Sequence, residues 1–292
     1  MSAIIEATGL TKYYGTSCVL EDVTFRVEPG NFFALVGRNG VGKSTLMRLL
    51  MRYEPLTRGT GKVFGIELSE DPKEQNSLIG YVSESLDYAV QCTLKQFFHF
   101  YRALQPRWDE HVFQDVLSEM HIDLNQQFKD LSRGQKMQVA FGAAIAAQPK
   151  LLILDEITAV MDANARSYFM QYLGYFAKQG GTVFMATNII SEVQNHARHV
   201  LLLNEGRVGI NCPVTEISKN FHKVRRMPGT DDAIYQDPDC QEVTFNSDGS
   251  ISYVMPIESA RRHKNWQSLQ DKRGLTIEET FIYFSKSEKR KP

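Results

Sequence analysis

The alternation of apolar and polar residues predicts two kinds of β-structure in this chain. Residues 32–36 and 151–154 are continuous apolar runs, and such runs are typical of parallel strands that are buried on both faces. Two later runs, 182–187 and 200–203, have the same character. Residues 3–27 instead alternate in two patches around a turn, which predicts an antiparallel hairpin or small sheet. The pattern therefore predicts an α/β fold with a parallel sheet and a separate antiparallel part.

Helical periodicity replaces the strand pattern between about residues 93 and 148. Two apolar faces recur at helical spacing, the first from Leu94, Phe97, Phe98 and Tyr101, the second from Val112, Val116, Leu117 and Met120. A break at residues 106–109 separates them. We therefore expect a helical subdomain, at about residues 86–148, inserted between two halves of the α/β core.

The last part of the chain departs from the core pattern. Residues 243–254 contain two short apolar patches around an Asp-Gly pair, which indicates a hairpin. Thr276 and Glu279 have the spacing of a capping box that begins a last helix. We predict two domains, a large α/β domain over residues 1–211 and a small α+β accessory or regulatory domain over residues 212–292.

The most informative stretch follows the first apolar run. It reads Gly-Arg-Asn-Gly-Val-Gly-Lys-Ser-Thr over residues 37–45, and a helical pattern comes directly after it. Strand, glycine-rich loop and helix are the context of a P-loop, in which backbone N–H groups and a helix N-terminus converge on phosphate oxygens. In such a loop Lys43 contacts the β- and γ-phosphates and the Ser44 hydroxyl binds Mg²⁺. The candidate phosphate-binding residues are Gly37, Asn39, Gly40, Gly42, Lys43, Ser44 and Thr45.

Two acidic residues end the apolar run at residues 151–154. Asp155 and Glu156 lie where ligands bind in parallel sheets, outside the carboxyl ends of the strands. Asp155 can there hold Mg²⁺ opposite Ser44. Glu156 can polarise an attacking water as a general base. With the P-loop, this pair predicts hydrolysis of a nucleotide with Mg²⁺.

Composition narrows the possible partners. The formal net charge is -1 and Lys and Arg are interspersed with acidic residues, so we expect no nucleic-acid partner. The cysteines form no CxxC pair, which argues against a zinc site or a disulfide scaffold and fits a reducing compartment. We find neither a signal-peptide pattern nor an apolar window of about 18 residues, so we expect no membrane span.

Four motifs in one order resemble the nucleotide-binding domain of ABC transporters. They are the P-loop, Leu-Ser-Arg-Gly-Gln at residues 131–135, the acidic strand end at residues 151–156, and Asp162. The second is similar to the family signature LSGGQ, with Arg133 at its first glycine, and it is the most specific because P-loops occur in many NTPases. The resemblance covers about residues 3–210. It implies a RecA-like P-loop NTPase core with an antiparallel β subdomain and a helical insertion.

The resemblance also assigns roles to single residues. In the family, Ser132 and Gly134 of one subunit, beside Gln135, cover the γ-phosphate bound by the opposite subunit. A hydroxyl and a helix N-terminus can complete an anion site in this way, although Ser132 can equally be an ordinary N-cap. Asp162 matches the loop that contacts the opposite subunit. Tyr14 looks like the aromatic residue that stacks on adenine.

Two further positions depart from the family's usual residues. Glu84 stands where the family has the glutamine that senses Mg²⁺ and the membrane partner, and a carboxylate is familiar there in export-type subunits. We count Glu84 with the catalytic and metal-site candidates. Asn188 stands where the switch histidine is expected. An asparagine is shorter and never cationic, so we expect slow ATP hydrolysis.

The resemblance implies an ATP-binding and hydrolysing subunit of an ABC transporter, with ATP and Mg²⁺ as cofactors. Its dimerisation with a second copy or a related ATPase subunit would drive separate integral membrane subunits, through a contact at residues 85–110. Residues 105–110 resemble the YtrB-like group, which pairs with ABC-2 type membrane subunits, and an exporter is therefore expected. Such a subunit works in the cytoplasm, on the inner face of the cell membrane.

Two alternative functions remain. The first is a slow or non-catalytic ATP-binding regulator, which Asn188 favours. The second is a soluble ABC ATPase that acts on ribosomes or DNA rather than in transport. Ribosome-acting members carry two P-loops in one chain and the DNA-repair type carries a long coiled coil, and this sequence has neither.

Overall fold

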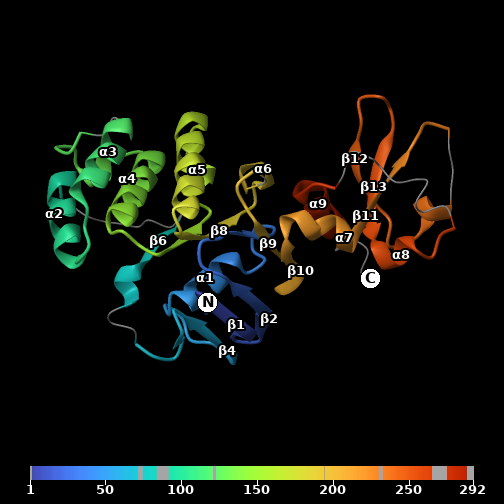
Figure 1. Cartoon of the computed structure of the whole chain (residues 1–292), viewed down its shortest axis with the longest axis horizontal. Helices are drawn as coiled ribbons and strands as arrows, with labels where there is room; N and C mark the ends of the chain where they lie inside the picture. The colour runs from blue at the N-terminus through green and yellow to red at the C-terminus, as the bar shows by residue number, and fades with distance from the viewer. Residues whose placement is uncertain are drawn as a thin grey trace.

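The computed structural model describes most of the chain, and its elements form three sheets with helices around them (Figure 1). The described residues are 2–71, 75–83, 92–120, 123–193, 195–229, 233–264 and 275–287. Within these ranges no helix is both long and apolar enough to cross a membrane. The site described below lies at one edge of the largest sheet.

A six-stranded sheet in the order β10-β9-β3-β8-β7-β6 forms the centre of the molecule. Its strands are β3 (Phe32–Val36), β6 (Ile79–Ser83), β7 (Leu151–Asp155), β8 (Thr182–Thr187), β9 (His199–Asn204) and β10 (Arg207–Pro213). The neighbours pair in parallel, except that β9 and β10 form an antiparallel hairpin. Phe32 and Ala34 pack into one apolar cluster whereas Phe33 and Leu35 pack into another on the opposite face. The prediction of a parallel sheet buried on both faces is confirmed.

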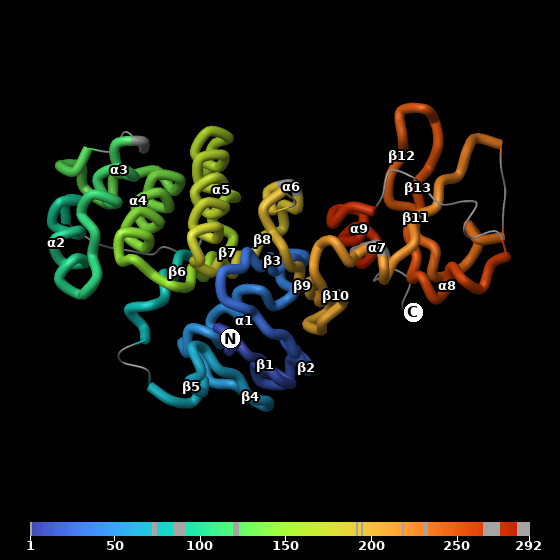
Figure 2. The backbone as a smooth tube through the Cα atoms, in the orientation of Figure 1, coloured from blue at the N-terminus to red at the C-terminus, as the bar shows by residue number. Residues whose placement is uncertain are grey.

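The antiparallel part near the N-terminus is a second sheet, in the order β2-β1-β4-β5. Its strands are β1 (Ile5–Tyr14), β2 (Ser17–Val27), β4 (Arg58–Val63) and β5 (Ile66–Glu67). Strands β1 and β2 are the predicted hairpin. Apolar side chains of this sheet and of helix α1 (Lys43–Leu50) share one cluster with β3. This packing fixes α1 between the two sheets, as the tube view shows (Figure 2).

The predicted helical insertion is present and has its own apolar cluster. Its helices are α2 (Leu94–Leu104), α3 (Glu110–Met120) and α4 (Arg133–Ala146). Thr93 begins α2 with a capping box to Gln96, and α4 leads directly back to β7. Helix α5 (Ala163–Lys178) and the short α6 (Ile190–Val193) cover the same face of the central sheet. The insertion forms the end of the molecule opposite the C-terminal part (Figure 1).

The C-terminal part contains the third sheet, in the order β11-β13-β12. Its elements are β11 (Phe221–Arg226), β12 (Gln241–Phe245), β13 (Ile251–Pro256) and the helices α7 (Ile217–Asn220), α8 (Ile257–Ala260) and α9 (Ile277–Ser287). The predicted capping box begins α9, because Thr276 and Glu279 exchange backbone-to-side-chain hydrogen bonds of 3.1 Å. Glu279 also pairs with Lys223 of β11 at 2.7 Å, which ties α9 to the sheet.

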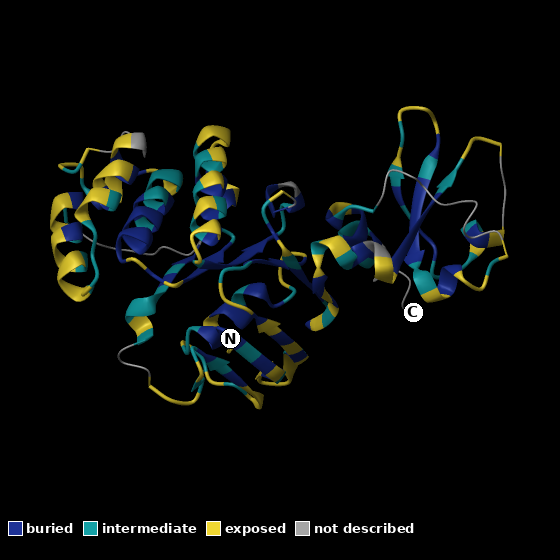
Figure 3. Cartoon of the chain, in the orientation of Figure 1, coloured by how far each residue is buried: buried dark blue, intermediate teal, exposed yellow. Residues whose placement is uncertain are grey.

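Helix α9 also joins this part to the core. Ile277 and Tyr283 belong to the apolar cluster that covers one face of the central sheet. The interior is therefore continuous between the two parts. Figure 3 shows buried residues along the strands of the central sheet and along those of the third sheet. Strand β10 continues to Pro213, slightly beyond the boundary expected at residue 211, and we propose that the accessory domain begins after it.

Candidate functional site

The glycine-rich loop connects β3 to α1 and leaves no room for a Cβ at two positions. Gly42 caps α1 with a left-handed φ of 107°, and a Cβ there would lie 2.7 Å from a Leu20 methyl. At Gly37 a Cβ would lie 2.9 Å from the Leu203 carbonyl oxygen. A side chain at either position would push the loop away from β2 or β9. The glycines thus hold the loop close against the sheets.

Lys43 is buried beneath this loop, and its ammonium makes three short contacts. Its Nζ lies 2.7 Å from the carbonyl oxygen of Gly37 and 2.9 Å from that of Arg38. The third contact is an ion pair of 2.8 Å with Glu156, and the Lys43 side chain is only 2% exposed. An ammonium has three donors, so the loop and Glu156 occupy all of them. Phosphate oxygens must take over some of these contacts when a nucleotide binds.

Ser44 and Asp155 bring the loop and the end of β7 together. The Ser44 hydroxyl donates to Asp155 at 3.1 Å. Burial raises the pKa of Asp155 above its ordinary value, whereas the Ser44 hydrogen bond and the Lys43 charge lower it. A hydroxyl beside a buried carboxylate is an oxygen donor set of the kind Mg²⁺ takes, and the cation would offset the cost of burying the charge. These two residues fit the metal.

Glu156 takes an unusual backbone conformation. Strand β7 ends at Asp155, and Glu156 has a left-handed φ of 53° and caps the turn Ile157–Val160. Its own N–H donates to the Ala186 carbonyl at 3.1 Å. A non-glycine residue in this region costs roughly 1–3 kcal/mol and often marks a functional site. The turn directs the Glu156 carboxylate to Lys43 rather than along the strand.

Asn188 contacts the P-loop directly. It follows β8, and its side-chain nitrogen donates to the Asn39 side-chain oxygen at 2.8 Å. The loop after β8 therefore lies against the P-loop. The structure brings together six of the predicted residues, namely Asn39, Lys43, Ser44, Asp155, Glu156 and Asn188. Glu84 lies outside the described residues.

Tyr14 ends β1 and borders the start of α1. Its hydroxyl donates to the Glu54 carboxylate, and the Lys12 ammonium lies 4.9 Å from the centre of its ring. Burial and the Glu54 hydrogen bond raise the pKa of Tyr14, whereas a hydrogen bond with Thr45 lowers it. Tyr14 is 43% exposed, so it is accessible for stacking next to the P-loop helix.

The residues of the signature motif act as helix caps within this chain. Ser132 begins α4, accepts from the Gln135 N–H at 3.2 Å and donates its own N–H to the Gln135 side chain at 3.0 Å. A Cβ on Gly134 would lie 3.0 Å from the Val160 carbonyl oxygen. Asp162 begins α5 and accepts from the Ala165 N–H at 2.9 Å. None of the recorded hydrogen bonds among the described residues joins these side chains to the P-loop.

Sequence reasoning did not single out the residues that connect these loops. Glu192 of α6 is buried and contacts Thr158, Thr187 and Arg166. Their signals in the sequence are weak. Glu192 is a single acid in a short apolar segment after Asn188, and Arg166 is a single base shortly after Asp162. Neither spacing has a defined chemistry of its own. Only the fold places them together.

Comparison with known proteins adds independent evidence. Residues 20–159 match the family model described as ABC transporter. The bacitracin transport ATP-binding protein BcrA of Enterococcus faecalis is 27% identical over 237 residues, which is 80% of this chain and 77% of that protein. The ABC transporter ATP-binding protein YtrB of Bacillus subtilis is 26% identical over 229 residues, 78% of each chain.

A third relative is more similar over a shorter span. The aliphatic sulfonates import ATP-binding protein SsuB of Pectobacterium atrosepticum is 34% identical over 208 residues, 70% of this chain and 76% of that protein. Among solved structures, one titled as an ATP binding subunit of an ABC transporter superposes with a TM-score of 0.68 at 24% identity, covering 74% of this chain and 92% of that one. This likeness confirms the predicted fold.

Proposed function

The chain belongs to the ABC transporter family as an ATP-binding subunit, and from that premise we propose that it hydrolyses Mg-ATP at the site around Lys43. One observation carries the proposal. Lys43 is buried with all three donors directed at the loop and at Glu156, and Ser44 meets Asp155 beside it. This is the set of side chains that phosphoryl transfer to water requires.

The chemistry follows from these positions. The β- and γ-phosphates of ATP replace the carbonyl contacts of Lys43, and Ser44 and Asp155 would hold Mg²⁺, which neutralises phosphate charge. Glu156, released from Lys43, accepts a proton from the water that attacks the γ-phosphorus. The bond between that phosphorus and the bridging oxygen breaks, and ADP and phosphate leave. Tyr14 stacks on the adenine, with the P-loop glycines around the phosphates.

We place the signature residues in the site of a second subunit, either another copy or a related ATPase. Ser132 and Gly134 begin α4, a helix long enough to have a full N-terminal partial charge. Within this chain Ser132 contacts Gln135, and Gly134 lies against the Val160 carbonyl. Asp162 begins α5 close by and would line the same interface.

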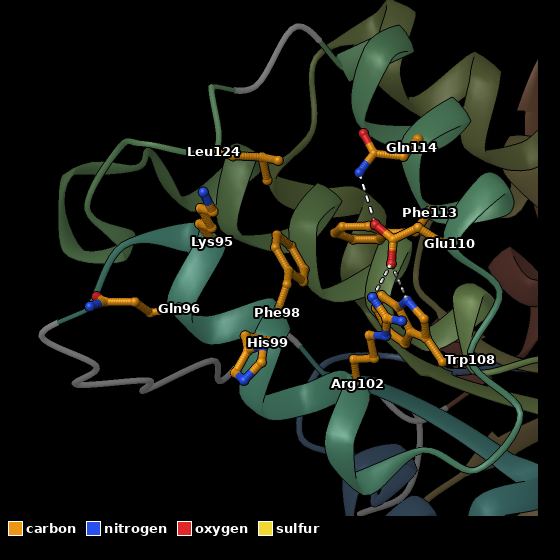
Figure 4. A pocket seen from close by; sticks show the side chains of 10 residues that line it. All are labelled: Lys95, Gln96, Phe98, His99, Arg102, Trp108, Glu110, Phe113, Gln114 and Leu124. Carbon is orange, nitrogen blue, oxygen red and sulfur yellow. Dashed lines mark hydrogen bonds and ion pairs between the residues drawn. The ribbon is translucent and has the colours of Figure 1, made fainter.

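We propose that the helical insertion contacts the membrane subunits. Of the expected contact range, residues 85–110, the structure describes residues 92–110. Between α2 and α3 lies a pocket of about 570 Å³ with an aromatic floor of Phe98, Trp108 and Phe113 (Figure 4). Glu110 is already satisfied by Trp108, Gln114 and Arg102. We propose an ABC-2 type exporter that works at the cytoplasmic face of the membrane, as the resemblance of residues 105–110 to the YtrB-like group implies.

Removing two exposed apolar side chains from α2 is expected to weaken this assembly. Phe100 is 65% and Leu104 60% exposed, and they lie one turn apart on the outer surface of α2. Phe100→Ser with Leu104→Ser should reduce co-purification with the membrane subunits at least about tenfold, since buried apolar contacts each contribute on the order of 1–2 kcal/mol. ATP binding should stay normal. Tyr175→Ser, an exposed aromatic change on α5, is the matched control.

We also propose that hydrolysis is slow, because Asn188 reaches less far than a histidine. Its amide nitrogen contacts Asn39, so it can still donate near the γ-phosphate. Asn188→His should raise kcat, by up to about 10²-fold if one positioned donor is restored, while ATP affinity changes little. Turnover and calorimetric binding of the purified chain test this. Asn195→His, at an exposed position seven residues further along the chain, controls for the added ring. A fast wild type that Asn188→His does not change would contradict slow hydrolysis.

A further inference from the structure

Two loops of the site meet at one buried carboxylate, that of Glu192. Glu192 Oε2 accepts from the Thr158 hydroxyl at 2.5 Å and from the Thr187 hydroxyl at 3.3 Å. Thr158 belongs to the turn that directly follows Glu156, and Thr187 directly precedes Asn188. The Glu192 side chain is only 4% exposed. One carboxylate therefore connects the loop of the general base to the loop of Asn188.

The second oxygen of Glu192 faces a cation that holds the same turn. Arg166 Nε lies 3.1 Å from Glu192 Oε1. The Arg166 Nη2 donates to the Thr158 carbonyl at 3.2 Å and to the Met161 carbonyl at 3.1 Å. Met161 precedes Asp162. The arginine thus fixes both ends of the segment that runs from Glu156 to the expected subunit contact.

The Thr187 hydroxyl connects Glu192 to the turn that carries Asn188. It donates to Glu192 and accepts from the Ile189 N–H at 2.9 Å. This closes a tight turn over Thr187, Asn188 and Ile189, and Asn188 projects from its middle to Asn39 of the P-loop. Without the carboxylate, the hydroxyl would be free to rotate to another acceptor and the turn would lose its anchor.

We propose that Glu192, paired with Arg166, is a positioning residue that holds Asn188 and the turn after Glu156 in one fixed arrangement. This inference rests on the proposed function, since both loops matter only if ATP is hydrolysed there. Glu192 touches no reacting atom. It acts through Thr187 on Asn188 and through Thr158 on the backbone next to Glu156. Misplacing a catalytic group by about 1 Å can cost 10²-fold in rate.

Glu192→Gln is the sharpest change, because the amide keeps the size of the side chain and one acceptor oxygen but loses the charge that Arg166 faces. We expect kcat to fall on the order of 10- to 100-fold, with KM and ATP affinity within about threefold of wild type. Combining Glu192→Gln with Asn188→Ala should lower kcat by clearly less than the product of the two single effects, because part of the Glu192 effect passes through Asn188. Effects that multiply in the double variant would show independent, purely structural damage.

A second measurement does not depend on turnover. Hydrogen exchange of the backbone at residues 187–190 should become faster in Glu192→Gln, since a neutral amide oxygen without the charge that faces Arg166 anchors the Thr187 hydroxyl, and with it the Ile189 N–H bond, more weakly. Glu279→Gln breaks an ion pair of similar burial with Lys223 and is the matched control. It should lower the melting temperature but change neither this exchange nor kcat. Unchanged exchange at residues 187–190 in Glu192→Gln overturns the inference. If the wild-type protein shows no turnover that Glu156→Gln removes, only the proposed hydrolysis is wrong.

Discussion

Lys43→Ala is expected to abolish most ATP binding while the chain stays folded. Its ammonium would make charge-assisted hydrogen bonds to two phosphates, each contributing about 1.5–3 kcal/mol. Their loss corresponds to roughly 10²- to 10⁴-fold in Kd. Isothermal titration calorimetry with ATP and Mg²⁺ measures this directly. The melting temperature should fall only modestly, because Glu156, 18% exposed beside Lys43, can take up water as a replacement partner.

Lys62→Ala provides the control for removing a lysine. Its ammonium pairs with Glu67 at 3.1 Å, and both side chains are more than a third exposed. Such surface pairs contribute little, so ATP affinity should not change. Wild-type affinity in Lys43→Ala itself would disprove the assignment of the P-loop, whatever the family likeness.

The backbone at the site could be predicted from local patterns. Continuous apolar runs identified β3, β7 and β8, and the glycines at residues 37–42 identified the connection that only glycine can make. The acids after β7 were placed correctly at the sheet edge, because the carboxyl ends of parallel strands meet there. The strands, the glycine-rich connection and the acids at the strand end could all be predicted because each depends on residues close together in the sequence.

The side-chain contacts at the site could not be predicted. Nothing in the sequence indicates that Lys43 pairs with Glu156, because that contact depends on the left-handed turn at Glu156. Glu192 and Arg166 were not recognised, since a single acid or base has no period or spacing that marks it. The continuity of α9 with the core was also not foreseen, because long-range packing of Ile277 and Tyr283 decides it.

Glu156→Gln should stop hydrolysis and leave binding intact. Losing a general base typically costs 10²- to 10⁴-fold in rate, measured as phosphate release. ATP affinity should instead rise several-fold, because glutamine carries no charge to hold Lys43 and the ammonium is then freer to meet phosphate. Such a rise in ATP affinity would show that the Lys43–Glu156 ion pair competes with ATP for the ammonium. Unchanged or weaker binding would indicate that the pair does not compete with ATP.

The same variant tests the assembly. With hydrolysis blocked, Mg-ATP stays between the P-loop of one subunit and the Ser132 end of α4 of the other, so the closed dimer should accumulate in size-exclusion chromatography. ADP should not produce it, because the γ-phosphate is the group that both subunits contact. Ser132→Ala in the Glu156→Gln background removes the hydroxyl that should reach this phosphate, and it should return the protein to the monomer at the same ATP concentration. A Glu156→Gln chain that stays monomeric with saturating ATP would exclude the homodimer and leave a related ATPase subunit as the partner.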